Sequence, residues 1–296
     1  MFVDLDGLGD GTPPPGATDG GGDTSAPVID SGGGNDTGVG PGEDSGPDAP
    51  VFDAGSDADL NKPCPTGGGP TMIRIPTPSG SFCIDSTEVT NGQYEAFLAA
   101  SPSTSGQGVF CNWNTSYVPK GAWPYAGGKA NYPIGYVNWC DATAFCKWAG
   151  KRLCGKIGVG AVDGGTGGGS MTGAEWANNL VSEFTYACSH GGTRTYPYGD
   201  TLDNTKCNGG PSATPAIEPV KNRATCESGW GGVYDLAGNV HEWANGCVIG
   251  GDPKTDTCAL QDSATGHISI EMTCTSWFAY PRQATEDEVS FRCCAD

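Results

Sequence analysis

Lysine and arginine are scarce in this chain of 296 residues, which has 15 of them against 34 aspartates and glutamates and a formal net charge of −19. Nucleic-acid-binding proteins cluster basic residues to neutralise phosphates, and anionic membrane surfaces attract basic segments in the same way. We therefore expect neither partner. Apolar runs stay far below the about twenty residues of a transmembrane helix, so we expect no membrane insertion either.

Several catalytic signatures are also absent. The chain has no GxSxG motif for a serine nucleophile and no GxxxxGK[ST] motif for phosphate binding. The glycine-rich stretch 155–170 is interpreted as an inserted flexible loop. The histidines, His190, His241 and His267, are scattered and do not predict an iron-binding cluster, and no cysteine pair has the CxxC spacing of a zinc site.

Residues 1–60 form a segment of distinct composition. They are rich in Gly, Asp, Pro, Ser and Thr, and contain thirteen acids with no lysine or arginine. Such a segment buries too little apolar surface to offset the entropy of ordering, so we predict a disordered acidic tether. The alternative, that its acids bind calcium, has no regular repeat to support it. We expect one folded domain over 61–296, with the remaining charge of −6.

All fourteen cysteines follow the tether, which is typical of a disulfide framework made in an oxidising compartment. The opening MFVDLDGLGDG lacks the basic and apolar regions of a signal peptide. We therefore expect an export signal upstream of this chain, with a lipid anchor as one form of it. The expected location is extracellular, on the cell surface or in the periplasm, as for a secreted protein or lipoprotein of the bacterial cell envelope.

The sequence of the first half of the domain predicts a β-hairpin followed by a helix. Residues 72–76 and 80–84 have the composition of two short strands. Thr90 then offers an N-cap, and Gln93 stands three residues later as in a capping box.

Two further helices are predicted from the same signals. One runs over about 139–150 after Asn138, and a short one begins at Thr172 with Glu175 in the capping position. Beyond them we expect strand fragments and many turns, hence a modest α+β core rich in loops.

The run GVYDLAGNVHEW at 232–243 carries the densest chemistry of the chain. Asp235, Asn239 and Glu242 supply side-chain oxygens, and Gly238 frees the backbone to turn its carbonyls inward. Calcium takes six to eight oxygen ligands of both kinds. The alternative is a tight turn whose acids face water.

This run also resembles the GLYDMAGNVWEW signature of the formylglycine-generating enzyme (sulfatase-modifying factor) family. Four further blocks resemble that family in the same order, namely 85–94 (DSTEVTNGQY), 133–139 with 147–153 (PIGYVNW and KWAGKRL), 196–200 (YPYGD) and 290–293 (SFRC). The resemblance implies the irregular, loop-rich C-type-lectin-like fold of that family, an α+β fold that is disulfide-stapled here.

The resemblance also implies a structural calcium ion. Its ligands would be Asp235, Gly238 and Val240 through carbonyl or side-chain oxygen, and Glu242 through its carboxylate. A second family site would lie near Asn208 and Gly209, but no acidic partner is recognisable there, so it is not proposed. His241 replaces the signature's tryptophan and is expected to be packed and partly exposed.

The sequence predicts partners for ten of the fourteen cysteines. The resemblance implies the disulfides Cys146–Cys293 and Cys188–Cys274, while proximity favours Cys64–Cys83, Cys207–Cys226 and Cys247–Cys258. The partners of the other four remain open: Cys111, Cys140, Cys154 and Cys294.

Enzymes of the family oxidise a sulfatase cysteine to formylglycine with oxygen and a copper(I) ion held by two thiolates. The matching region here follows Cys258, and no cysteine stands between Cys258 and Cys274. We therefore predict a domain that has lost the copper site and acts as a calcium-stabilised binding or assembly module for a protein, peptide or glycan. The alternatives are an active copper-dependent oxidoreductase with a rearranged thiol pair, and a purely structural envelope protein.

Overall fold

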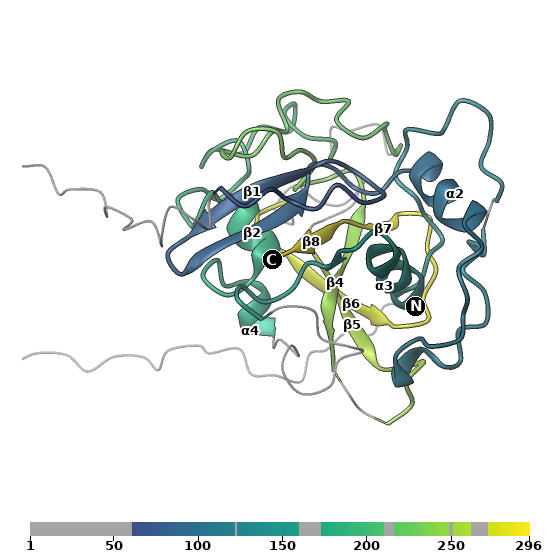
Figure 1. Cartoon of the computed structure of the whole chain (residues 1–296). Helices are drawn as coiled ribbons and strands as arrows, with labels where there is room; N and C mark the ends of the chain where they lie inside the picture. The colour runs from purple at the N-terminus through teal and green to yellow at the C-terminus, as the bar shows by residue number, and fades with distance from the viewer. Residues whose placement is uncertain (1–60, 122, 160–172, 210–215, 249–250, 262–271) are drawn as a thin grey trace, which may run out of the picture. The chain divides into compact units, whose positions relative to one another are not determined.

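The protein is described by a computed structural model, in which residues 61–121, 123–159, 173–209, 216–248, 251–261 and 272–296 are placed (Figure 1). The chain divides into the units 1–50 and 51–296, and every described residue belongs to the second. The predicted tether, the helix cap at Thr172 and most of the glycine-rich stretch lie outside the described residues. Among the described helices, none has the length and apolar character needed to cross a membrane.

One sheet joins the two ends of the described chain. Its order is β1 (Met72–Thr77), β2 (Gly80–Asp85), β8 (Cys293–Ala295) and β3 (Arg152–Leu153), with antiparallel neighbours throughout. β1 and β2 form the predicted hairpin, and Figure 1 shows the last strand beside β2. The C-terminal strand therefore closes the sheet against the first hairpin.

A second sheet carries Glu242 of the candidate site. Its order is β6 (Trp277–Pro281), β5 (Thr257–Gln261), β4 (His241–Cys247) and β7 (Val289–Phe291), and only the β4–β7 pair is parallel. β7 ends one residue before Arg292, and β8 of the first sheet begins one residue after it. Arg292 therefore stands at the crossing from one sheet to the other.

The two longer helices begin where the capping residues predict. α2 (Asn91–Ala99) is preceded by Thr90, and α3 (Trp139–Trp148) by Asn138; both cap side chains accept a hydrogen bond from the third helical residue, which bonds back in turn. Their inner faces join β7 in the main core, where the Tyr94 and Phe145 rings stack at 5.7 Å between centroids.

Two short helices, α4 (Gly173–Trp176) and α5 (Glu183–Cys188), follow the glycine-rich stretch, and a 3-10 turn covers Val109–Cys111. α5 was not predicted, because strand fragments and turns were expected there. Its residues are all buried, so no polar face marks a helical period in the sequence. The N-cap Ser182, whose side chain accepts from the backbone of Thr185, was the signal available.

All fourteen cysteines lie in the described residues and form seven disulfides: Cys64–Cys83, Cys111–Cys140, Cys146–Cys293, Cys154–Cys294, Cys188–Cys274, Cys207–Cys226 and Cys247–Cys258. The pairings left open in the sequence are thus Cys111–Cys140 and Cys154–Cys294. The adjacent Cys293 and Cys294 close loops of 147 and 140 residues. A disulfide typically contributes ~2–4 kcal/mol by restricting the unfolded chain, and the contribution grows with the length of the loop.

Candidate metal centre

Three residues in the loop that leads into β4 have a left-handed backbone conformation. Asp235, Gly238 and Asn239 have φ values of 57°, 81° and 69°. A Cβ atom on Gly238 would collide with the backbone carbonyl of Asn208, so only glycine fits where the two segments meet. This geometry brings the predicted ligands Asp235, Gly238 and Val240 onto one short curl immediately before Glu242.

The acids of this loop do not face water. Asp235 is 4% exposed and Glu242 is 1% exposed, so the interpretation as a solvated turn is wrong. His241 is also only 1% exposed, and its ring packs edge-on against Phe278 with 4.8 Å between centroids. The expected partial exposure of this imidazole is therefore wrong, since the side chain is buried.

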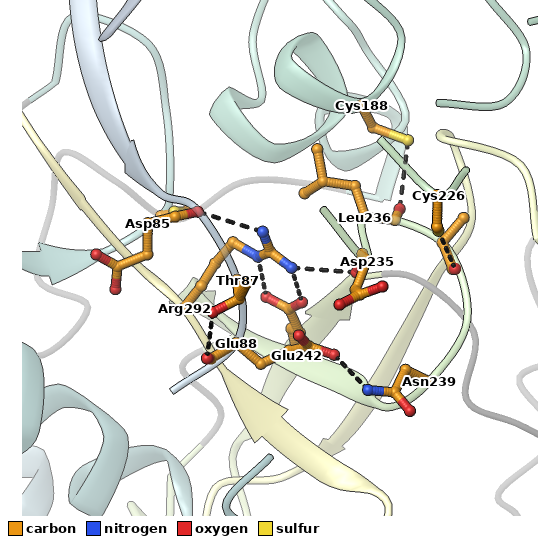
Figure 2. Close-up of polar contacts among 12 residues, drawn as sticks. Asp85, Thr87, Glu88, Cys188, Cys226, Asp235, Leu236, Asn239, Glu242 and Arg292 are labelled. Carbon is orange, nitrogen blue, oxygen red and sulfur yellow. Dashed lines mark hydrogen bonds and ion pairs between the residues drawn. The ribbon is translucent and has the colours of Figure 1, made fainter. Parts of the chain in front are cut away.

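Arg292 occupies the middle of the site (Figure 2). Its guanidinium donates to both carboxylate oxygens of Glu242 at 2.7 Å, and to the backbone carbonyls of Asp235 at 3.1 Å and Asp85 at 3.3 Å. Arg292 is 1% exposed. This buried bidentate ion pair holds the 235–242 loop in a fixed position relative to the segment that crosses between the two sheets.

Glu88 is the acidic member of the site that the sequence did not assign. Its side chain is fully buried, and Oε1 accepts a hydrogen bond from Nδ2 of Asn239 at 2.9 Å. Oε2 is buried with no hydrogen-bond partner among the described residues. Glu88 and Arg292 both lie inside blocks that resemble the family, at 85–94 and 290–293, and that was the signal available for them.

The remaining oxygens of the loop are partly occupied. Oδ1 of Asn239 accepts from Nδ2 of Asn208 and from the backbone N–H of Glu218, both at 3.0 Å. Oδ2 of Asp235 accepts from the backbone N–H of Lys221 at 2.5 Å. The amide oxygen of Asn239 is therefore committed to the protein and is removed from the set of cation ligands.

The buried charges of the site do not balance. Glu88, Asp235 and Glu242 carry three formal negative charges against the single positive charge of Arg292, and none of the four is more than 4% exposed. Burial, together with the neighbouring Asp235 and Glu242, raises the pKa of Glu88 well above its usual value. Burial also raises the pKa of Asp235 to about 6, and that of Glu242 despite Arg292. A divalent cation would neutralise this excess.

The residues present fit a hard cation. Carboxylate and main-chain oxygens are the ligands that calcium selects, and Glu88 Oε2 has no hydrogen-bond partner in the described chain whether or not it carries a proton. The carboxylate oxygens of Glu88, Asp235 and Glu242 do not all lie within 4.8 Å of one another among the described residues. An ion would thus be held by part of this set together with loop carbonyls.

A different triad comes closer together but does not form a metal site. Ligand atoms of Cys154, Glu183 and Cys294 lie within 4.8 Å of one another. The two cysteines are joined in a disulfide, and both oxygens of Glu183 accept from Arg152 at 2.6 Å. Every ligand of the triad therefore already has a partner.

Copper(I) does not fit the described thiols. Cys258 is bonded to Cys247 on the neighbouring strand, and they are 0% and 2% exposed. The other twelve cysteines are paired as well. Since copper(I) selects thiolates, a site of two reduced, accessible cysteines is not present in the described residues.

The model of the sulfatase-modifying factor enzyme 1-like domain matches residues 74–294, and the chain belongs to this family. A formylglycine-generating enzyme of Streptomyces coelicolor is 27% identical over 207 residues, which cover 55% of this chain and 57% of that protein. The inactive C-alpha-formylglycine-generating enzyme 2 of Bos taurus is 26% identical over 180 residues, or 56% and 50% of the two chains. The chain thus spans little more than half of these relatives.

The fold is that of the family, irregular, loop-rich and C-type-lectin-like, with mixed helices and sheets. The structure of PvdO from Pseudomonas aeruginosa superposes with a TM-score of 0.51 and 18% identity, covering 74% of this chain and 81% of that one. At this identity the likeness concerns the fold alone, so function has to be argued from the site.

Proposed function

We propose that this protein is a sulfatase-modifying-factor-like domain without the copper-thiolate oxidase site, which acts as a calcium-stabilised binding or assembly module. The observation that carries the proposal is the pairing of all fourteen cysteines in disulfides. Oxidation of a peptide cysteine at copper(I) needs two thiolates that the substrate can reach. Cys258, the cysteine nearest to the expected copper region, is fully buried in a bond between two strands.

Calcium has a stabilising role in this proposal. Asp235, Gly238, Val240, Glu242 and the added Glu88 would hold the ion, which supplies two positive charges and no redox chemistry. The buried excess of carboxylates over Arg292 supports this assignment. The bound ion would fix the loop that joins the Asp235 turn to β4 and leave other loops free to bind a ligand.

The proposed setting is extracellular, on a cell surface or in the periplasm. Seven disulfides are typical of oxidising compartments, and the acidic segment 1–60 would act as a spacer between the domain and an anchor. An export signal or lipid anchor upstream of this chain belongs to the same proposal.

Two measurements test the loss of the oxidase site. Alkylation of denatured, unreduced protein followed by mass spectrometry is expected to label none of the fourteen cysteines. The purified protein is then incubated with copper(I), oxygen and a sulfatase-type Cys-x-Pro-x-Arg peptide, beside an active family enzyme. We expect no formylglycine. Conversion of the peptide by this protein would establish the alternative, an active oxidoreductase with copper as its cofactor.

A further inference from the structure

A hollow outside the metal centre lies between the segment that follows α2 and the segment before β7. Its volume is about 230 Å³, and its walls include Trp123, Tyr125, Lys129, Tyr132, Tyr136 and Asp287. Sites for drug-sized ligands usually measure about 300–1,000 Å³, so this hollow suits a ligand of about one ring. None of the carboxylates around Arg292 contributes to its walls.

Two of the aromatic side chains, Trp123 and Tyr125, are fixed by contacts with neighbouring residues. The Trp123 ring meets Tyr125 edge-on, with 5.4 Å between centroids, and meets the buried Tyr94 at 6.2 Å. The hydroxyl of Tyr125 donates to Glu95 at 2.8 Å. Both rings nevertheless stay partly exposed, so they form a fixed apolar wall open to a ligand.

Tyr136 is held in a strained backbone conformation at the same place. Its φ is 58°, which is rare for a bulky residue. Its N–H donates to the Glu286 carbonyl at 2.8 Å, and its own carbonyl accepts from the N–H of Lys120 at 3.2 Å. Its ring also lies so close to Gly121 that a Cβ there would collide with it. Strain maintained by this many contacts is typical of ligand-binding positions.

The rim of the hollow is polar and has no net charge. Lys129 and Asp287 are both exposed and of opposite sign. Within the described chain, the hydroxyls of Tyr132 and Tyr136 have no hydrogen-bond partner. The Lys129 ammonium already lies 5.2 Å from the centre of the Tyr132 ring, which disfavours a cationic ligand there.

We propose that this hollow binds a neutral pyranose ring, the sugar unit of a glycan. One face of a pyranose carries C–H groups that pack on aromatic rings, and its edge carries hydroxyls that both donate and accept hydrogen bonds. The walls supply the rings, and Lys129, Asp287 and the tyrosine hydroxyls supply matching partners. The inference rests on the proposed function, since it names the class of ligand that the binding module takes.

The test uses the full chain with calcium and a panel of probes. The probes are methyl glycosides of neutral hexoses and N-acetylhexosamines, and short neutral oligosaccharides, followed by saturation-transfer NMR and by titration. We expect saturable binding of at least one sugar. Trp123→Ala should weaken it about tenfold by removing the main aromatic wall, and Asp287→Asn should weaken it severalfold.

Trp148→Ala is the matched control, because Trp148 is a partly exposed tryptophan on α3 outside this hollow. It should leave sugar affinity unchanged. Because Asp287 is exposed, its substitution tests the site even if Trp123→Ala fails to fold. The proposal is overturned if no sugar binds, if Trp123→Ala and Trp148→Ala lose affinity equally, or if a proline-rich peptide binds here in place of sugars.

The same preparation is assayed for formylglycine, so that the two proposals fail separately. Absence of sugar binding together with absence of peptide oxidation would overturn only the sugar site. Peptide oxidation would overturn the binding-module proposal whatever the sugars do.

Discussion

Two groups of buried charge lie near the short β8 strand, and they differ in balance. In the first group, Lys151 pairs with Asp85 at 2.6 Å and Arg152 pairs with Glu183 at 2.6 Å, so each buried carboxylate has its own cation. In the second group, Arg292 is the one buried cation among the described residues that faces Glu88, Asp235 and Glu242. The balanced group is complete as protein, whereas the unbalanced group has the charge of a site for an added cation.

Substitution of the single cation in the unbalanced group should have the largest effect. Arg292→Met would leave three buried carboxylates without a partner and remove four hydrogen bonds. We expect a loss of about 3–5 kcal/mol in the free energy of unfolding, measured by urea denaturation. Lys151→Met, which strands only Asp85, should cost less.

Equal losses for these two variants would contradict the difference in balance. If Arg292→Met does not fold, Arg292→Lys serves instead. This variant keeps the positive charge but loses the bidentate hydrogen bonds to Glu242, so it should still be less stable than the wild type.

Calcium should stabilise the protein through the unbalanced group only. At a calcium concentration about one hundred times Kd, the expected gain is about 2.7 kcal/mol, measured as a rise in Tm after removal of metal with a chelator. Asp235→Asn should abolish the gain. Glu183→Gln, in the balanced group, should leave it intact, and a calcium response that survives in Asp235→Asn would place the ion elsewhere.

Removal of one carboxylate should change the free energy of unfolding in opposite directions in the two groups. Glu88→Gln, without calcium, should raise the free energy of unfolding by about 1 kcal/mol, because folding would no longer have to protonate this carboxylate or bury its charge without a cation. Glu183→Gln should lower it, because Arg152 would lose its bidentate partner. Denaturation of both variants in chelator measures this, and a loss of stability in Glu88→Gln would show that the carboxylate is already compensated.

A pH-dependent effect is expected from Asp141, a buried carboxylate in neither group. Burial raises its pKa to about 7, against hydrogen bonds from the Asn138 backbone and the Asn114 amide. The folded state therefore binds the proton more tightly than the unfolded state, whose pKa is about 3.9. The stabilisation is fully present below pH about 4 and is lost as the pH rises through about 7.

Urea denaturation at pH 5.5 and pH 8, in chelator, measures this contribution. Asp141→Asn should show a smaller fall in stability between the two pH values than the wild type. An unchanged fall would assign the pH dependence to the other buried carboxylates.

The predicted elements differ in how well local sequence defined them. The hairpin at 72–85 and the starts of α2 and α3 follow from alternation and from capping residues, which act within a few positions. α5 was missed because burial on all sides leaves no periodic pattern. The acids of the 232–243 loop were found by their chemistry, but their burial was not, since it depends on segments far away in the chain.

The sequence by itself determined the family, the number of cysteines and the position of the loop at Asp235 to Glu242, because motifs and spacing are local properties. Only the tertiary structure decided which charges meet. Glu88 lies 151 residues before Asn239, and Arg292 lies 50 residues after Glu242, yet all four are buried together. Folding removes these groups from water, and the resulting charge imbalance exists only once distant segments are packed side by side.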